Sequence, residues 1–443
     1  MNIILLSGGS GKRLWPLSND IRSKQFIKLF KTNEGTYESM VQRVYRQILS
    51  VDKDAKITIA TSKSQVSTLQ NQLNGSIDIC VEPARRDTFP AIALAAAFLH
   101  DIKHIDENET VIVCPVDPYV DESYFEALKH LGELANRGES ALSLLGIAPS
   151  YPSEKYGYII PENGASVSHV QTFKEKPDIE TAKKYILSGA LWNGGVFAFK
   201  LKYLLSRARD IIGVSGYEDI LNQYLNLEKI SFDYAVVEKE ENIQVMRFNG
   251  EWKDLGTWNT LSEEMDELII GNGILNETCE NSAIINELNV PVLCMGLQNT
   301  IVAASSEGIL VSTKEQSSYI KPYVDSFNQM VMFAEKSWGN FQIIDVAEGS
   351  LTIKVTLNPG HSMNYHSHEQ RDEVWTITKG LATVIIDGMQ RAVRPGDVIT
   401  MPSGCKHTII ADTQVEVIEV QLGKELSIRD KIKYNLEEEL KKH

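Results

Sequence analysis

The chain has 443 residues, too many for one ordinary hydrophobic core, so we expect two or three domains. Hydrophobic residues make up 43% and charged residues 23%, the ordinary balance of a soluble globular protein. The formal net charge of −15 argues against a general nucleic-acid binder, which needs a basic surface, but it does not exclude small anionic substrates.

Two features indicate a cytoplasmic protein without membrane insertion. The longest strongly apolar run, Ala91–Leu99, is far too short to span a bilayer, and the first residues carry no basic leader. Five scattered cysteines without a CxxC pair are typical of reduced thiols.

The first half of the chain alternates short apolar runs with helical patterns. Strands are predicted at Asn2–Leu6, Lys56–Ala60, Thr110–Cys114 and Ala141–Ile147. Helices are predicted at Tyr37–Leu49, Phe89–Ile102 (with Asp87 and Thr88 as its cap) and Tyr124–Asn136. This alternation predicts an α/β domain over residues 1–265 with a mostly parallel sheet covered on both faces.

The rest of the chain has a β-rich pattern. Residues 266–335 are expected to form a small β-rich connector, because Gly271–Val324 contains short β-runs and turn residues. After Ser337, strands are predicted at Leu351–Leu357, Val374–Thr378, Ala382–Ile386 and Val415–Gln421. They predict an all-β barrel or sandwich over 336–443, finished by a charged surface helix in residues 425–443.

A glycine-rich cationic loop follows the first strand: Leu6-Ser7-Gly8-Gly9-Ser10-Gly11-Lys12-Arg13. Its backbone N–H groups can face phosphate oxygens, and Lys12 and Arg13 add positive charge. Leu14 excludes a dinucleotide fingerprint, and Arg13 after Lys12 excludes a Walker A loop. A glycine-rich turn without a ligand stays open as the alternative, although the cations of the next segment, Arg22–Phe26, favour a phosphate site.

This loop and six later segments resemble the mannose-1-phosphate guanylyltransferases, a family of sugar-nucleotide pyrophosphorylases. The segments are Gly8–Leu17 with Lys24–Phe26, Glu82–Ala95, Cys114–Asp117, Tyr156–Ile159, Phe173–Pro177, Trp192–Phe197 and Trp252–Trp258. The resemblance covers roughly residues 2–335, and the order of the segments makes it specific. The chain departs from the family's usual residue at Ser23 (Pro), Asp87 (Asn), Pro118 (His) and Gly194 (Ser).

The resemblance implies a Rossmann-like nucleotidyltransferase domain that binds a nucleoside triphosphate and a sugar 1-phosphate and releases pyrophosphate. Displacement at the α-phosphorus between two polyanions requires alignment and charge neutralisation. The residues implied as catalytic are Arg13 and Lys24, and those implied to hold Mg²⁺ are Asp117 and Asp254. The nucleotide-binding residues implied are Leu6, Gly8, Gly9, Ser10, Gly11, Lys12, Glu82, Arg86, Asp87 and Thr88. The sugar-phosphate residues implied are Gly157, Glu175, Lys176 and Asn193.

Five of these residues also have a structural interpretation. Glu175 and Lys176 could form a surface ion pair, Asn193 before two glycines is a good turn former, and Asp254 could cap a helix. Asp117 could be an ordinary turn residue. The functional interpretation is favoured because these residues should converge at the carboxyl edge of a parallel sheet.

Four of the nine histidines lie between His361 and His407. The spacings Gly360-x5-His366-x-His368-x4-Glu373-x6-Gly380 and Gly396-x5-Pro402-x-Gly404-x2-His407 resemble both halves of the cupin signature. His366, His368, Glu373 and His407 offer three nitrogens and one oxygen, a set that suits Zn²⁺, Fe²⁺, Ni²⁺ or Mn²⁺. The barrel resembles the mannose-6-phosphate isomerase half of bifunctional enzymes. A metal-bound barrel without isomerase activity stays open, because the chain departs from that pattern at Thr408 and after Gly423.

The leading prediction is the reaction of GTP with mannose 1-phosphate to GDP-mannose, which serves glycan or polysaccharide synthesis. One alternative keeps the reaction but changes the sugar 1-phosphate, for instance to a heptose or glucose, or changes the base. Another alternative is a cupin-type sugar-binding or regulatory protein with an inactive transferase half. The resemblance is also consistent with a homodimer.

Overall fold

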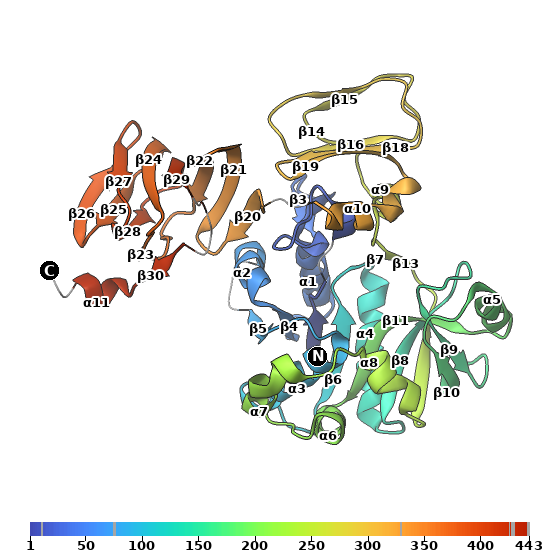
Figure 1. Cartoon of the computed structure of the whole chain (residues 1–443). Coiled ribbons are helices and arrows are strands. Elements are labelled where there is room, and N and C mark those ends of the chain that lie inside the picture. The colour runs from blue at the N-terminus through green and yellow to red at the C-terminus, as the bar shows by residue number, and fades with distance from the viewer. Residues whose placement is uncertain (10–11, 74–76, 328–329, 425, 427–429, 441–443) are drawn as a thin grey trace. The chain divides into compact units, whose positions relative to one another are not determined.

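The computed structural model describes residues 1–9, 12–73, 77–327, 330–424, 426 and 430–440. The chain divides into two compact units (Figure 1). The first comprises Met1–Gly11, Ser23–Val66 and Leu73–Asp266, and the second comprises Lys12–Arg22, Ser67–Gln72 and Glu267–His443. Among the described residues, no helix is both long and apolar enough to cross a membrane.

The first unit is built on a nine-stranded sheet in the order β5-β4-β1-β6-β11-β8-β12-β10-β9. Its strands are β1 (Asn2–Leu6), β4 (Lys56–Ser62), β5 (Asp78–Glu82), β6 (Thr110–Pro115), β8 (Leu142–Ile147), β9 (Gly157–Pro161), β10 (Val167–Lys174), β11 (Leu191–Lys200) and β12 (Ile243–Phe248). Strands β5, β4, β1 and β6 pair in parallel, as the alternation of strands and helices predicts. Strand β11 then joins antiparallel to both β6 and β8, and β9 and β10 extend the sheet as an antiparallel pair.

Helices cover both faces of this sheet because neighbouring strand residues point to opposite sides. Val111 and Val113 of β6 belong to the apolar cluster that buries α3. Between them, Ile112 faces the other way, toward Gly132 of α4. The helices are α1 (Met40–Val51), α3 (Thr88–Asp101), α4 (Glu122–Arg137), α5 (Ile179–Leu187), α6 (Leu201–Ile212), α7 (Tyr217–Gln223), α8 (Phe232–Ala235) and α9 (Trp258–Glu263). Helix α2 (Val66–Leu73) includes residues of both units.

The first predicted helix needs a correction at its start. Residues Tyr37–Ser39 form strand β3, which pairs antiparallel with β2 (Lys28–Lys31), and α1 begins only at Met40. The physical reason is a capping box: the Ser39 side chain accepts the N–H of Gln42, and the Gln42 side chain accepts the N–H of Ser39. The cap of α3 is confirmed, since Asp87 Oδ1 accepts the N–H of Thr88 at 2.8 Å.

From Ile269 on, the second unit contains a group of short strands, seen in Figure 1 as stacked turns. Strands β14 (Ile269–Gly271), β16 (Ala283–Asn286) and β18 (Thr300–Ser305) pair in parallel, and β19 (Gly308–Thr313) closes their sheet antiparallel. Strands β15 (Gly273–Leu275) and β17 (Val292–Cys294) form a second parallel pair. Ile284, Cys294 and Val302 fill the small core between them. The short helix α10 (Lys321–Asp325) follows.

The remaining strands form the predicted all-β domain from two sheets. The first has the order β20-β21-β22-β29-β24-β27, and the second has the order β26-β25-β28-β23-β30. Alternate residues of β22, β24, β25 and β29 point into one apolar core that includes Trp375. The strands are β20 (Phe333–Lys336), β21 (Gly339–Ala347), β22 (Ser350–Leu357), β23 (His366–Ser367), β24 (Arg371–Lys379), β25 (Ala382–Ile386), β26 (Met389–Val393), β27 (Val398–Met401), β28 (His407–Ala411), β29 (Val415–Gly423) and β30 (Ile432–Lys433).

The predicted helical tail is wrong in its first part. Residues Ile432–Lys433 form β30, which pairs antiparallel with β23, and only α11 (Leu436–Leu440) is helical in the described tail. The cause is tertiary: the strand supplies backbone hydrogen bonds to the short strand that carries His366. Such pairing leaves no local signal in a charged sequence.

Candidate functional site

Polar residues gather where parallel strands of the first unit end. Asp117 follows β6, Glu82 is the last residue of β5, and Leu6 ends β1 directly before the glycine loop. Because β5, β4, β1 and β6 run parallel, their carboxyl ends lie at one edge of the sheet, where open α/β folds bind ligands.

Two carboxylates meet one lysine at this edge. Lys24 Nζ lies 2.9 Å from Asp117 Oδ2 and 3.7 Å from Asp254 Oδ1. Strands β7 (Pro118–Val120) and β13 (Trp252–Asp254) pair antiparallel and bring the two carboxylates together. Their register sets Asp254 opposite Pro118, the residue after Asp117. Asp254 caps no helix, because Thr257 is the N-cap of α9. Removal from water alone would raise the pKa of Asp117, but the adjacent Lys24 ammonium lowers it and keeps the carboxylate ionised.

This carboxylate pair fits a magnesium ion in its donor chemistry. Mg²⁺ binds few protein carboxylates and takes its other oxygen ligands from water and phosphate. Asp117 and Asp254 both reach the same cationic atom of Lys24, so a second cation at this place can also contact both.

The glycine loop is anchored by Ser23, the position where the family usually has proline. Ser23 is fully buried; its hydroxyl donates to the Gly9 carbonyl at 2.9 Å and accepts from Gln65 Nε2 at 2.6 Å. Gly8 and Gly9 are exposed, and Gly9 has φ of 108°, which a residue with a side chain rarely adopts. Of the predicted loop residues, Ser10 and Gly11 lie outside the described residues.

Lys12 and Arg13 lie in the second unit, on a 3-10 helix over Lys12–Leu14. Lys12 Nζ lies 3.4 Å from both Asp20 and Asp325. Arg13 is exposed.

The predicted nucleotide residues Glu82, Arg86, Asp87 and Thr88 lie around the start of α3. Glu82 is buried and accepts a hydrogen bond from Tyr224 at 2.8 Å; burial raises the pKa of this carboxyl. Arg86 donates to the Leu225 carbonyl. Asp87 has φ of 70° and ψ of −174°, a conformation that costs free energy for any residue except glycine and occurs mainly at functional sites.

The predicted sugar-phosphate residues also come together. Strands β9 and β11 set Gly157 opposite Asn193. Glu175 pairs with Lys176 Nζ at 2.6 Å. This is the ion pair considered as the structural alternative, but the Glu175 side chain is buried and not on the surface. A Cβ atom at Gly157 would lie 2.4 Å from Glu175 Oε2, so only glycine leaves room for this carboxylate.

Asp233 of α8 belongs to this group, although the sequence analysis missed it. Its Oδ1 accepts from Asn193 Nδ2 at 2.6 Å, while Asn193 Oδ1 accepts the N–H of Gly195 at 3.1 Å. Burial raises the pKa of Asp233 to about 6, and the Glu175 carboxylate acts in the same direction. The preceding residue, Phe232, donates its N–H to Thr88 Oγ1 at 2.8 Å. Helix α8 therefore contacts both the predicted nucleotide residues and the predicted sugar residues.

Three aromatic rings, Tyr156, Trp192 and Trp252, pack together beside Asn193 and Asp254, and the sequence analysis also missed them. The Tyr156 ring packs against Trp192 with centroids 4.8 Å apart and against Trp252 at 5.6 Å, and Asp254 lies two residues after Trp252. The indole N–H groups of Trp192 and Trp252 are buried and have no hydrogen-bond partner among the described residues. The motif blocks Tyr156–Ile159, Trp192–Phe197 and Trp252–Trp258 contained the signal, since each begins with one of these rings.

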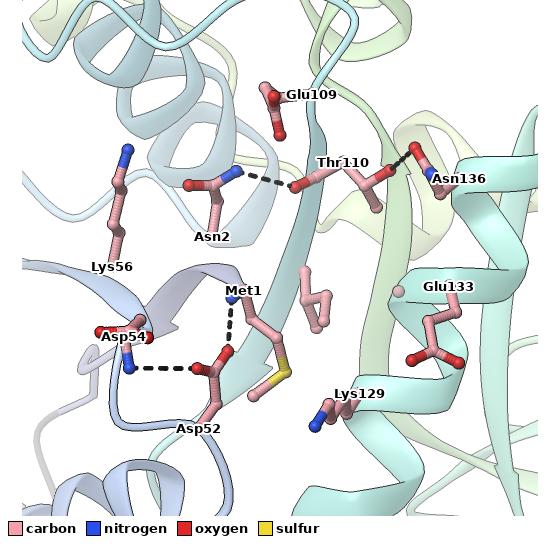
Figure 2. Close-up of a pocket in the computed structure, with 12 residues that line it drawn as sticks. Met1, Asn2, Asp52, Asp54, Lys56, Glu109, Thr110, Lys129, Glu133 and Asn136 are labelled. Atoms are coloured by element: carbon pink, nitrogen blue, oxygen red, sulfur yellow. Dashed lines mark hydrogen bonds and ion pairs between the residues drawn. The ribbon is translucent and has the colours of Figure 1, made fainter.

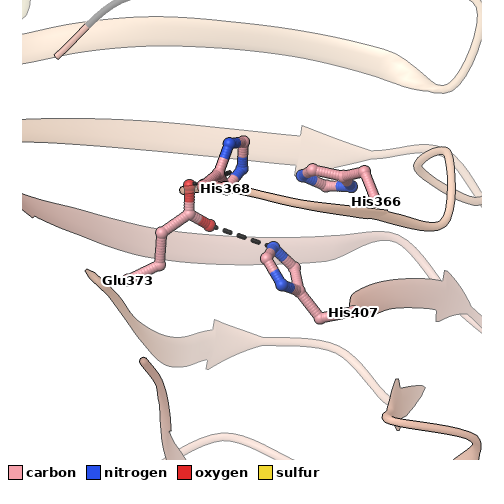
Figure 3. Close-up of side chains that lie close together, drawn as sticks. All are labelled: His366, His368, Glu373 and His407. Atoms are coloured by element: carbon pink, nitrogen blue, oxygen red, sulfur yellow. Dashed lines mark ion pairs between the residues drawn. The ribbon is translucent and has the colours of Figure 1, made fainter. Parts of the chain in front are cut away.

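The barrel of the second unit gathers the four predicted metal ligands, as Figure 3 shows. Ligand atoms of His366, His368, Glu373 and His407 all lie within 4.8 Å of one another, and all four side chains are buried. Glu373 Oε1 lies 3.0 Å from His368 Nε2, and Glu373 Oε2 lies 3.3 Å from His407 Nε2. Burial alone would raise the pKa of Glu373, but its contacts with His368 and His407 lower it.

Hydrogen bonds turn the histidine rings in the way that metal ligands need. Nδ1 of His366 faces the Asn364 carbonyl at 2.6 Å, Nδ1 of His407 faces the Cys405 carbonyl at 3.0 Å, and Nδ1 of His368 faces the Asp430 carbonyl. A carbonyl only accepts, so Nδ1 carries the proton and the Nε2 lone pairs point inward. Apart from the Glu373 carboxylate 3.3 Å away, His407 Nε2 is buried with no partner among the described residues, as a ligand atom would be. The donor set fits a first-row divalent metal.

A separate cavity of about 430 Å³ lies at the opposite edge of the sheet in the first unit (Figure 2). Asn2, Lys56 and Thr110 line it, and they stand at the amino ends of β1, β4 and β6. The terminal amine of Met1 pairs with Asp52 at 2.6 Å in its wall. None of the predicted site residues lines this cavity, so its size does not mark the reaction site.

Comparison with known proteins finds one family match in each of the two regions that hold these residues. The nucleotidyl transferase family matches residues 2–269, and the cupin domain family matches residues 353–421. The mannose-1-phosphate guanylyltransferases of Salmonella montevideo and Escherichia coli (strain K12) are each 28% identical to the chain. The first alignment covers 98% of both proteins, and the second covers 97% of both.

A solved structure from Thermus thermophilus, described as a mannose-1-phosphate geranyltransferase, is 28% identical with a TM-score of 0.62. It covers 73% of this chain and 98% of its own. Because the match to residues 2–269 covers more than half of the chain, the protein is an enzyme of the nucleotidyl transferase family.

Proposed function

We propose that the protein joins GTP and mannose 1-phosphate to give GDP-mannose and pyrophosphate. The observation that carries this proposal is the meeting of Asp117 and Asp254 at Lys24, beside the glycine loop at the carboxyl edge of the sheet. The choice of GTP and mannose 1-phosphate is supported by the names of relatives that align over nearly their full length.

The proposed roles follow from charge and position. A phosphate oxygen of the sugar phosphate attacks the α-phosphorus of GTP, and the bond to pyrophosphate breaks. The attacking phosphate is already ionised at neutral pH, so no strong base is needed. Lys24 would stabilise the α-phosphate while negative charge moves toward the leaving group. Arg13 would stabilise the triphosphate and the departing pyrophosphate. Mg²⁺ bound by Asp117 and Asp254 would supply further neutralisation of the phosphate charge.

The acceptor sugar is proposed to bind at Gly157, Glu175, Lys176 and Asn193. Lys176 Nζ, paired with Glu175, would meet its phosphate, and Glu175 and Asn193 would accept or donate hydrogen bonds to its hydroxyls. Burial alone would lower the pKa of Lys176, but its bond to Glu175 raises it, so the ammonium stays charged at neutral pH.

The barrel is proposed to hold a divalent transition metal at His366, His368, Glu373 and His407. The protein is proposed to act in the cytoplasm, because all five of its cysteines are free thiols.

The test is pyrophosphate release with Mg²⁺ across four nucleoside triphosphates and several sugar 1-phosphates, with the product identified by mass. We expect turnover with GTP and mannose 1-phosphate to exceed every other pair. Faster turnover of another pair would replace the proposed substrates but keep the transferase. Folded protein that is silent with every pair would refute the proposal.

A further inference from the structure

Arg371 contacts two of the four ligands in the barrel. It lies on β24 two residues before Glu373, so both side chains point to the same face, and both are buried. Its Nε donates to Glu373 Oε1 at 3.0 Å, and its Nη2 lies 3.1 Å from His368 Nε2. A guanidinium has only donors, so His368 Nε2 must be the acceptor.

These contacts use the same lone pairs that a metal ion needs. The Nδ1 atom of His368 faces the Asp430 carbonyl, which leaves Nε2 as its ligand atom. Glu373 Oε1 is only 3.0 Å from this Nε2, so two acceptor atoms face each other and need a positive charge between or beside them. Arg371 supplies that charge by touching both atoms.

The surroundings of Glu373 hold a second acid and a further cation. Glu419 is buried nearby and accepts from Gln421 Nε2 at 2.5 Å, and the charge of Lys431 acts on both carboxylates, whereas Arg371 touches Glu373 directly. Trp375 Nε1 and Gln421 Nε2 also donate to Glu373, but both are neutral. A buried carboxylate that loses its cationic partner destabilises a fold strongly.

We propose that Arg371 is an internal counter-ion of Glu373 that competes with the metal ion for His368 Nε2. Metal binding requires the guanidinium to release this nitrogen, because an imidazole nitrogen has one lone pair, whereas a carboxylate oxygen can accept from a second partner. The arginine thus weakens the metal affinity of the barrel while stabilising its fold at low metal concentration. This inference rests on the proposed metal site of the barrel and does not depend on the transferase reaction.

The test removes the guanidinium and measures metal binding directly. Full-length protein stripped with a chelator is titrated with Co²⁺ and with Zn²⁺, using cobalt absorption and a competing chromophoric chelator, and its unfolding is followed with and without metal. We expect Arg371→Met to bind metal about tenfold more tightly or better, the scale of a lost charge-assisted hydrogen bond. Without metal it should unfold at a lower temperature than wild type, so its metal-induced shift should be larger.

Two further variants show whether the effect comes from the Arg371 fork, from its positive charge alone, or from the loss of any arginine in the barrel. Arg371→Lys keeps the charge, but an ammonium lacks the fork that spans both atoms; we expect it to bind metal more tightly than wild type. Arg391→Met removes an exposed arginine of the same barrel and should change neither measurement. Metal affinity of Arg371→Met equal to or weaker than wild type would overturn the proposal. So would an Arg371→Lys affinity equal to wild type, since charge alone would then suffice. If Arg371→Met does not fold, the lysine variant decides.

Discussion

Replacement of Gly157 by alanine tests the acceptor site through a single methyl group. The new Cβ would lie 2.4 Å from Glu175 Oε2 and 2.9 Å from Phe173 Cζ, whereas ordinary contact begins at 3.4 Å, so the carboxylate must move by about 1 Å and the ring by about 0.5 Å. Glu175 is buried and pairs with Lys176 Nζ at 2.6 Å, so this movement disturbs both proposed sugar-phosphate ligands. A displacement of about 1 Å in a site costs roughly a hundredfold in rate, or about 2.7 kcal/mol of transition-state stabilisation.

The assay is pyrophosphate release, first at saturating GTP with varied mannose 1-phosphate and then at saturating mannose 1-phosphate with varied GTP. We expect kcat/KM for the sugar phosphate to fall about a hundredfold, while the KM for GTP stays near its wild-type value. Gly164→Ala is the matched control, because a Cβ at this glycine would meet no atom within 4 Å. A wild-type kcat/KM in Gly157→Ala, or an equal loss in Gly164→Ala, would refute the reasoning. Thermal unfolding of both variants shows whether misfolding contributes.

Three other substitutions test the remaining geometry of the first unit. Asp254→Asn should lower Mg²⁺-dependent turnover at least about a hundredfold without loss of folding, because a metal ligand contributes several kcal/mol; near-normal rates would contradict the assignment. The pKa of Asp233 is raised to about 6, so the folded protein holds this proton more tightly than the unfolded chain. This binding stabilises the fold at low pH, and the stabilisation is lost as the pH rises through 6. Asp233→Asn should therefore unfold at a higher temperature than wild type at pH 8 and by a smaller margin at pH 5; an equal difference at both pH values would argue against the shift. Ser23→Ala removes the hydroxyl that joins the Gly9 carbonyl to Gln65 and leaves that carbonyl with weaker contacts at 3.5 Å to Gln65 Nε2 and Arg85 Nη2. Unfolding should therefore cost about 1–3 kcal/mol less and the KM for GTP should rise; unchanged stability and KM would show that the hydroxyl does not hold the loop.

Local patterns in the sequence were sufficient for the fold class, and the resemblance to a known family supplied most of the candidate site residues. Alternating strands and helices specified the parallel half of the sheet, and the spacing of His366, His368, Glu373 and His407 specified a ligand set that the barrel brings within 4.8 Å. The start of α1 was missed although its signal was local, since Ser39 and Gln42 have the spacing of a capping box.

The contacts between distant segments were decided only by tertiary structure. Asp254 reaches Asp117 because the register of β13 on β7 sets it there, and Asp233 meets Asn193 across forty residues of chain. The tail strand β30 beside His366 likewise left no pattern in the sequence. Periodicity and spacing are properties of neighbours in the chain, and they determined the elements, the glycine loop and the metal ligands. Which carboxylate pairs with which cation depends on strand register and on burial, and these exist only in the folded protein.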